Sequence, residues 1–277
     1  MDYYIPKIFR NISNQKFFLE NGFCKIRFGT NKEINACINL FNNNIGKVEK
    51  YGFEGNDNFD IRENKASNSE KIIKIFKDSL IKNFTNISPF YGTYLVKPTG
   101  ENSIIPPHQD WTNVDESKDV SFGIWIPIED VNTENGALFF IPGSQKITNS
   151  VRTNNPYPWP FAKVQNELMH FAKTVTCKKG EAIVINHKVI HGSHKNTTNK
   201  PRNVCIIGAK NKDAQLIHFY LKEKPNKRFD LQKIKYKDKD FQEILRNKKP
   251  KPINSSKISD YTFPSFNIDD IIKHLVN

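Results

Sequence analysis

The chain has 277 residues, with 42 Lys and Arg against 29 Asp and Glu, and a formal net charge of +13. Hydrophobic residues make up 37% of it, including 21 Phe, which is enough to build the core of one large domain. No apolar run approaches the length of a membrane span, and we expect no secretory signal at the N-terminus. The four cysteines have no regular spacing, so we expect no disulfide framework and a cytoplasmic protein.

The positive charge is concentrated near the C-terminus. Residues 222–257 hold 13 Lys and Arg against 5 Asp and Glu, a net of +8. Such a segment is either a surface for an anionic partner or a solvated face of the protein. We favour the solvated face, because arginine clusters interleaved with aromatic residues are lacking. Nucleic acid is therefore disfavoured as a partner, and the sequence does not indicate an oligomeric state.

The N-terminal third predicts mostly helices. Residues 15–28 are typical of a short helix, a Gly turn and a strand. Thr30 and Glu33 have the spacing of a capping box at the start of a helix over 31–44. A second amphipathic helix is predicted over 69–83. We expect these helices to buttress one face of a sheet.

From Tyr91 onward the pattern changes to short segments rich in β-branched or aromatic residues. Gly, Pro and Asn separate these segments, which favours an all-β sandwich or barrel. The predicted strands cover residues 91–96, 121–128, 137–141, 174–177, 182–185, 204–209 and 215–220.

A long insertion at 143–172 interrupts these strands and includes a predicted helix over 162–172. An insertion of this length inside a compact domain is often a lid or a substrate-binding loop. The alternative is a surface excursion that only covers the core. Farther on, the sequence predicts a helix near 238–247 and a short amphipathic tail over 268–275.

These segments predict one main domain. We expect it to span 1–221 with its core at 90–220, followed by a basic extension over 222–277 that packs on the same domain.

The most informative pattern is the triplet His108-Gln109-Asp110 combined with His191 far downstream. His108 and Asp110 are two residues apart, so on one strand both side chains point to the same face. Two imidazoles and one carboxylate on one face are the ligands of a non-haem Fe(II) oxygenase, which leaves coordination positions open for cosubstrate and oxygen. We therefore predict an Fe(II) site.

Two other histidines compete with His191 for the third ligand position. His187 follows a buried strand and is the best alternative, whereas His194 is expected at the surface or on the substrate side. Taken alone, each of these histidines would more often be an ordinary core or surface residue. We prefer His191 because of the residues that follow it.

Arg202 follows His191 by eleven positions and begins the next predicted strand. A guanidinium can bind a carboxylate through two hydrogen bonds, and a strand start near the metal suits the distal carboxylate of a dicarboxylic cosubstrate. Ser193 lies on the same face as His191 and could add a hydroxyl group. An arginine alone would more often be a surface residue, but its place after His191 favours the binding role.

Taken together, the motifs resemble the phytanoyl-CoA dioxygenase family of Fe(II)/2-oxoglutarate-dependent oxygenases. The resemblance is strong over 90–210, weaker over 15–45 and absent after 220, and the family usually has a His in place of Gln145. The motifs that carry it are residues 94–98, 108–110, 125–130, 135–138, 141–146, 180–181, 191–193 and 201–202.

The resemblance implies a mainly β fold with flanking helices, namely the double-stranded β-helix or jelly roll of the cupins. It implies that His108, Asp110 and His191 are the iron ligands and the catalytic centre. It also implies that Arg202 and Ser193 bind the far carboxylate of 2-oxoglutarate.

Two further positions match family residues that line the metal and cosubstrate pocket. Trp125 is one of them, although it could equally pack in the core. Gln109 is the other, although on an ideal strand it should point away from its two neighbours.

The implied reaction is hydroxylation of an unactivated C–H bond, with O2 consumed and succinate and CO2 released. Asp110 favours hydroxylation or desaturation over halogenation, because halogenases of this type lack the carboxylate. The rival interpretations are a zinc site on the same ligands and a non-catalytic jelly-roll binding module. Neither of them requires Ser193 and Arg202.

The substrate is expected to be a small metabolite or a biosynthetic intermediate, because the fold alone cannot choose among substrates. Lys97 is a candidate contact for an anionic substrate, and a solvated strand end is the alternative. The other candidate pocket residues are Trp111, Thr112, Tyr157, Trp159 and Phe161.

Overall fold

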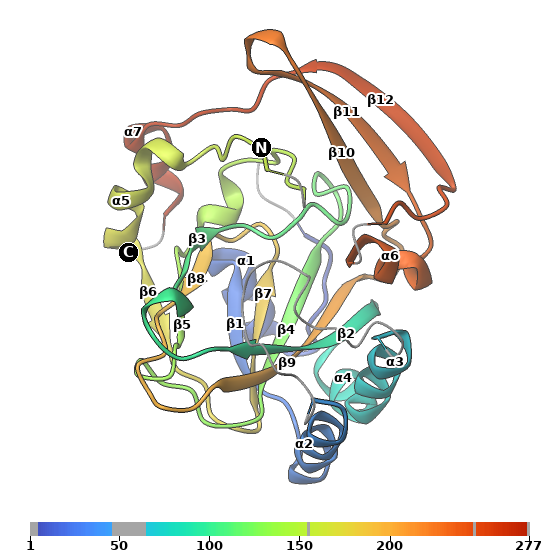
Figure 1. The fold of residues 1–277 in the computed structure, drawn as a ribbon, viewed down its shortest axis with the longest axis vertical. Helices are drawn as coiled ribbons and strands as arrows, with labels where there is room; N and C mark the ends of the chain where they lie inside the picture. The colour runs from blue at the N-terminus through green and yellow to red at the C-terminus, as the bar shows by residue number, and fades with distance from the viewer. Residues whose placement is uncertain (1–4, 46–64, 154–155, 246–247, 276–277) are drawn as a thin grey trace.

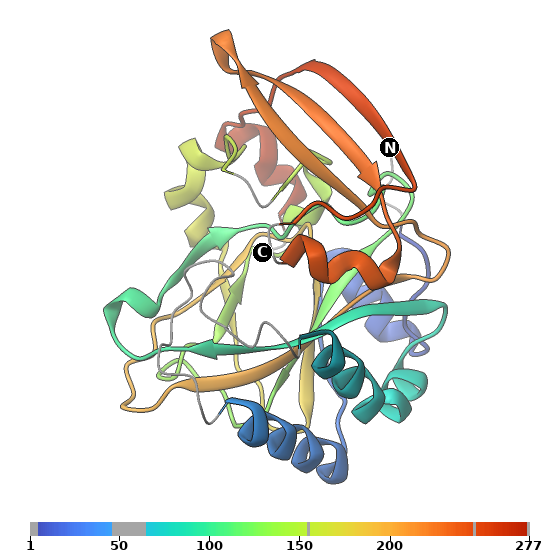
Figure 2. The same ribbon diagram turned by 45° about the vertical axis from the view of Figure 1, so that its right-hand side comes forward.

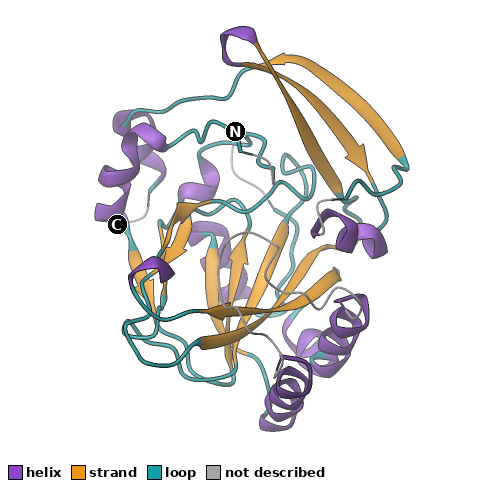
Figure 3. Ribbon diagram, in the orientation of Figure 1, coloured by secondary structure: helices purple, strands orange, loops and turns teal. Residues whose placement is uncertain are grey.

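A computed structural model describes residues 5–45, 65–153, 156–245 and 248–275. Two antiparallel sheets form its centre, and a third sheet projects from it near the C-terminus (Figures 1 and 3). The strands are β1 Phe23–Arg27, β2 Ile87–Lys97, β3 Ile105–His108, β4 Ser121–Pro127, β5 Leu138–Phe140, β6 Lys173–Val175, β7 Glu181–Asn186, β8 His191–Ser193, β9 Arg202–Asn211, β10 Ile217–Lys224, β11 Arg228–Lys235 and β12 Asn254–Tyr261. The helices are α1 Ile12–Asn21, α2 Asn31–Ile45, α3 Lys65–Ile75, α4 Lys77–Asn83, α5 Gln165–Leu168, α6 Phe241–Leu245 and α7 Ile268–Ile271.

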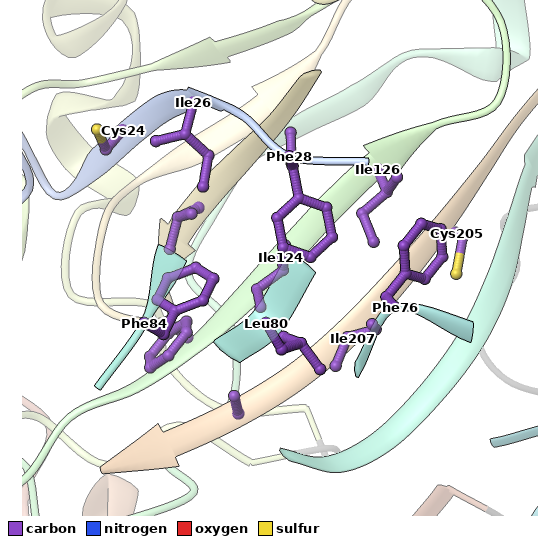
Figure 4. Packing of buried hydrophobic residues seen from close by; sticks show 14 of the residues in the cluster. Cys24, Ile26, Phe28, Phe76, Leu80, Phe84, Ile124, Ile126, Cys205 and Ile207 are labelled. Carbon is purple, nitrogen blue, oxygen red and sulfur yellow. The ribbon is translucent and has the colours of Figure 1, made fainter. Parts of the chain in front are cut away.

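The larger sheet has the strand order β1-β7-β4-β9-β2, and the N-terminal helices cover its outer face. Figure 4 shows this packing, in which aromatic and aliphatic side chains from helices and strands interlock. Burial of this apolar surface is the main force that holds the helices on the sheet. The labelled members are Cys24, Ile26, Phe28, Phe76, Leu80, Phe84, Ile124, Ile126, Cys205 and Ile207. The predicted buttress is therefore present.

The smaller sheet has the order β3-β8-β5-β6 and packs against the inner face of the larger one. A second apolar cluster joins the two sheets, and within it the rings of Phe23 and Phe140 stack with centroids 4.2 Å apart. Two antiparallel sheets packed face to face form the predicted jelly roll. All strands predicted between 91 and 220 are present within a few residues of their expected bounds.

Two local predictions for the N-terminal helices have different outcomes. The capping box is confirmed, because the Thr30 amide donates to Glu33 Oε2 at 2.8 Å and the Glu33 amide donates to Thr30 Oγ1 at 3.2 Å. The single helix predicted over 69–83 is instead two helices, α3 and α4, that meet at Phe76. Phe76 leaves the helical conformation and is fully buried, with its ring 5.6 Å from that of Phe28.

The basic segment forms two strands that the sequence did not predict. β10, β11 and β12 make a three-stranded antiparallel sheet, which arches away from the jelly roll in Figures 1 and 2. Helix α6 packs at its base, where a helix was expected over 238–247, of which residues 246–247 lie outside the described residues. The domain boundary predicted between 221 and 222 falls inside β10, so the extension continues a strand of the main domain.

The C-terminal segment packs against the insertion at 143–172. Instead of one helix over 162–172 it contains α5 between two single 3-10 turns, and α7 packs beside it in Figures 1 and 2. Gly143 has φ of +87°, and a Cβ at this position would lie 2.1 Å from the carbonyl oxygen of His274. Residues 154–155 of the insertion lie outside the described residues. No helix in the described ranges is long and apolar enough to cross a bilayer.

Candidate functional site

The two predicted histidine ligands are cross-strand partners. In the antiparallel pair of β3 and β8, His108 lies opposite His191, and their ring centroids are 4.4 Å apart. Nδ1 of His108 lies 3.0 Å from the carbonyl oxygen of Pro106, and Nδ1 of His191 lies 3.0 Å from that of Val189. These carbonyls accept from Nδ1–H and so leave Nε2 of each ring with a lone pair for a cation.

Asp110 joins the histidines from a loop. One ligand atom from each of His108, Asp110 and His191 lies within 4.8 Å of the others, and Asp110 Oδ2 is 3.9 Å from His191 Nε2. β3 ends at His108, so the expectation that one strand presents both His108 and Asp110 is wrong. The side chain of the intervening residue Gln109 is buried, and its amide donates to the carbonyl oxygen of Lys188 at 2.5 Å.

The pKa shifts of His108 and Asp110 suit a divalent cation. Burial, and then the nearby His191, lower the pKa of His108 to about 4, so its imidazole is neutral at pH 7. Burial raises the pKa of Asp110, but the nearby His191, His187, His108 and Arg152 outweigh it and hold the pKa below its usual value. Neutral imidazoles and an ionised carboxylate are the forms that bind metals.

The competing histidines have other partners. Nδ1 of His187 lies 2.8 Å from Ser121 Oγ and 3.2 Å from Asn113 Nδ2. His194 is half-buried, with Nε2 2.8 Å from Thr174 Oγ1. The structure therefore brings together the three ligands that were preferred and leaves these two histidines out of the cluster.

A second group of buried side chains, Lys97, Ser193 and Arg202, forms a cationic cluster. Arg202 is 2% exposed, yet its Nε and NH1 have no hydrogen-bond partner among the described residues. Its guanidinium lies 5.0 Å from the centre of the Trp125 ring, and Trp125 also packs in the apolar cluster between the two sheets, which was the alternative for this residue. Burial lowers the pKa of Arg202 to about 10, and Glu129 opposes this shift.

Lys97 belongs to this cationic cluster and is not a solvated strand end. Its side chain is fully buried, and Nζ donates to Ser193 Oγ at 2.8 Å and to the Ser103 carbonyl. Burial, and then the positive charge of Arg202, lower the pKa of Lys97 to about 7. A buried guanidinium with free donors beside a lysine and a hydroxyl is a ready site for a carboxylate.

The aromatic residues expected around the substrate separate into two groups. Trp111 follows Asp110 directly and packs edge-on to His218 with centroids 6.0 Å apart. The hydroxyl of Tyr157 lies near enough to Arg152 and Asp110 to feel their charges. Burial raises the pKa of Tyr157 to about 12; Arg152 opposes this shift, and Asp110 adds to it. Trp159 packs with Phe161 in the apolar cluster under α7.

Sequence reasoning missed a buried ion pair beside the triad. Arg152 NH1 and NH2 donate to the two carboxylate oxygens of Glu116 at 2.9 and 2.5 Å. Arg152 Nε donates to the backbone carbonyl of Asp110 at 2.6 Å. No spacing marked Arg152 or Glu116 in the sequence, because their segments meet only in the folded chain.

Comparison with known proteins places the chain in a family. The family model for phytanoyl-CoA dioxygenase matches residues 20–204. The chain belongs to the phytanoyl-CoA dioxygenase family. It is 36% identical over 98 residues to a Caenorhabditis briggsae homolog of phytanoyl-CoA dioxygenase domain-containing protein 1, which covers 31% of this chain and 33% of that one. It is 28% identical over 148 residues to phytanoyl-CoA dioxygenase of Arabidopsis thaliana, which covers 47% and 52%. The chain thus spans about half, or less, of the length of these relatives.

Several solved structures have a similar fold at low sequence identity. The carbocyclase SnoK of nogalamycin biosynthesis superposes with a TM-score of 0.53 at 15% identity, over 90% of this chain and 96% of that one. HygX of Streptomyces hygroscopicus, solved with nickel and 2-oxoglutarate, has a TM-score of 0.52 at 13% identity, over 74% and 87%. The epimerase SnoN, solved with Fe3+, alpha-ketoglutarate and nogalamycin RO, has a TM-score of 0.51 at 16% identity, over 73% and 83%. At these identities the likeness establishes the fold.

Proposed function

We propose that the chain is an Fe(II)- and 2-oxoglutarate-dependent dioxygenase that hydroxylates a C–H bond of a small metabolite or biosynthetic intermediate. Succinate and CO2 are the coproducts. The observation that carries this proposal is the buried, unsatisfied Arg202 guanidinium that accompanies a His-Asp-His donor set.

The donor set fits iron. His108 and His191 offer Nε2, and Asp110 offers a carboxylate oxygen that offsets part of the cation's charge. Such a two-histidine, one-carboxylate set is typical of Fe(II) oxygenases, because it leaves one side of the metal open. When bound, iron and 2-oxoglutarate supply the oxidising power that the protein side chains lack.

The cationic cluster fits the far carboxylate of 2-oxoglutarate. Arg202 has two free donors for it, Lys97 contributes a second cation, and Ser193 contributes a hydroxyl. Ser193 is two residues beyond His191 on β8, so an anion held there extends toward the metal ligands. Lys97, first considered as a substrate contact, is therefore proposed as a cosubstrate contact.

Relatives of the same fold support the cofactors and leave the reaction outcome open. HygX and SnoN were solved with a metal and the 2-oxo acid, but SnoN is described as an epimerase and SnoK as a carbocyclase. Hydroxylation is the outcome that we propose, because Asp110 occupies the position that a halogenase leaves free. Trp111 and Tyr157 are the proposed substrate contacts, and a cytoplasmic location and a small-molecule substrate remain part of the proposal.

A single titration tests the proposal. Apo-protein is mixed anaerobically with Fe(II) and then with 2-oxoglutarate, and the visible charge-transfer band of the chelated 2-oxo acid is recorded. The band is expected with the natural chain and not with Asp110→Ala. A folded, iron-loaded protein without the band would contradict the cosubstrate assignment and favour a zinc or binding role.

A turnover assay complements the titration. Succinate release coupled to a substrate should vanish in both His108→Ala and Asp110→Ala. Retained coupled release in both variants would exclude the triad as the catalytic centre.

A further inference from the structure

The three metal ligands differ in what holds their backbone. His108 and His191 face each other in a hydrogen-bonded strand pair, so the β3–β8 register sets both imidazoles. Asp110 lies beyond the end of β3, where no strand partner fixes it. A ligand on a loop needs another support if its carboxylate is to keep a defined position.

Arg152, from the insertion at 143–172, provides contacts to this loop. Its Nε donates to the carbonyl oxygen of Asp110 at 2.6 Å. The backbone of Arg152 also makes two hydrogen bonds with Thr112. The Thr112 amide donates to the Arg152 carbonyl at 3.0 Å, and the Arg152 amide donates to Thr112 Oγ1 at 3.0 Å. The ligand loop is therefore tied to the insertion on both sides of Trp111.

Glu116 fixes the direction of the Arg152 side chain. Both carboxylate oxygens of Glu116 accept from the guanidinium, and NH1 also donates to the carbonyl oxygen of Ser150 at 2.9 Å. The guanidinium is planar, so two bonds to Glu116 determine where Nε points. Arg152 is fully buried, and an ion pair in that setting keeps its geometry.

We propose that Arg152, oriented by Glu116, is a positioning residue for Asp110, so that the insertion sets the geometry of the third metal ligand. This inference rests on the proposed function, because it requires a metal on the triad. Residues that orient metal ligands typically change metal affinity by about 10–100-fold when they are replaced.

A merely structural ion pair would behave differently. Its loss would lower the stability of the fold, but a molecule that stayed folded would bind metal as before. Arg152→Lys separates the two roles, since this variant keeps the charge but cannot make the bidentate contact and the Nε bond together.

The experiment compares Arg152→Met, Arg152→Lys and Glu116→Gln with the natural chain. Each protein, checked for folding by near-UV circular dichroism, is titrated anaerobically with Fe(II) in a calorimeter, and its charge-transfer band with 2-oxoglutarate is recorded. The control is Ile72→Ala, which removes a fully buried side chain from the helix-covered face of the larger sheet, away from the triad.

The metal Kd is expected to rise about 10–100-fold in Arg152→Met and Arg152→Lys, with a shifted or broadened band. Glu116→Gln should fall between these variants and the natural chain, and Ile72→Ala should lower stability without changing the Kd. A natural-chain Kd and band in the folded Arg152 variants would overturn the inference. If Arg152→Met does not fold, Arg152→Lys and Glu116→Gln decide it. Failure of the natural chain to bind Fe(II) would instead remove the proposed function and, with it, this inference.

Discussion

Two arginines are buried beside the predicted ligands, and their surroundings differ. Arg152 is fully buried, and its guanidinium binds a carboxylate and two backbone carbonyls. Arg202 is 2% exposed, and two of its donors have no partner among the described residues. Buried donors without hydrogen-bond partners cost free energy, so stability alone does not account for the two open donors of Arg202. The difference indicates a structural role for Arg152, whereas the open donors of Arg202 are where we propose that the cosubstrate carboxylate binds.

The largest effect is expected from the loss of Asp110, because the proposed roles of both arginines require a metal on the triad. Replacing Asp110 by Ala removes the anionic ligand and should abolish Fe(II) binding and coupled succinate release. Asp115 is a matched control, because its carboxylate lies on the same loop but accepts from Ser117 Oγ at 2.7 Å. Asp115→Ala should keep both properties. Equal loss in the two variants, measured by calorimetry and succinate assay, would contradict a specific role for Asp110.

The comparison is sharpened by unfolding the two arginine variants without metal or cosubstrate. Arg152→Met should lower the free energy of unfolding by about 3–5 kcal/mol, because it leaves Glu116 buried without its cation. Arg202→Met should lower the free energy of unfolding much less than Arg152→Met, because the contact with Trp125 and the attraction of Glu129 are lost together with two unpaired buried donors. Urea titrations give both values. A loss as large in Arg202→Met as in Arg152→Met would mean that Arg202 has structural partners in solution.

Arg202 should contribute more to 2-oxoglutarate binding than to the free energy of unfolding. Arg202→Met should weaken 2-oxoglutarate binding to the metal-loaded protein by about 2–5 kcal/mol, since the cationic cluster has then lost the guanidinium that would bind the carboxylate. Arg228 on β11 is exposed and supplies the control variant Arg228→Met. Calorimetric titration with 2-oxoglutarate measures both. Unchanged affinity in Arg202→Met would place the carboxylate elsewhere.

The smallest effect concerns a proton on Lys97. Because its pKa is lowered to about 7, a fraction of Lys97 is neutral above that pH in the free protein. A carboxylate bound in the cationic cluster favours the charged form of Lys97. Binding of 2-oxoglutarate should therefore take up less than about one proton per chain above about pH 7 and none well below it. Calorimetry in buffers of different ionisation enthalpy counts these protons. Lys97→Met should abolish the uptake, and uptake that persists in this variant would assign it to another group.

Much of the jelly roll could be predicted because its strands carry continuous apolar runs. β4 and β7 are buried almost throughout, and their apolar runs were visible between Gly and Pro positions. β12 was missed because seven of its eight residues are exposed, which leaves no periodic signal. β11 was missed because Lys233 and Lys235 lie among its apolar residues.

For the candidate site, the residue types were easier to predict than their supports. His108, Asp110 and His191 were found because ligand chemistry restricts which residues can serve. Strand spacing was a poor guide to Asp110, since β3 stops before it. Arg152 and Glu116 are 36 residues apart and have no motif of their own, so only the folded chain joins them.

The pairing of His108 with His191 has a consequence for how a purified sample is judged. Side chains alternate between the two faces of a strand, so a slip of one residue between β3 and β8 would turn one imidazole away from the other. A mispaired molecule would therefore hold no cation, even if it were compact and remained in solution. The number of metal ions bound per chain then counts the molecules in which the smaller sheet has closed in its native register, and it serves as a measure of sample quality before any substrate is known.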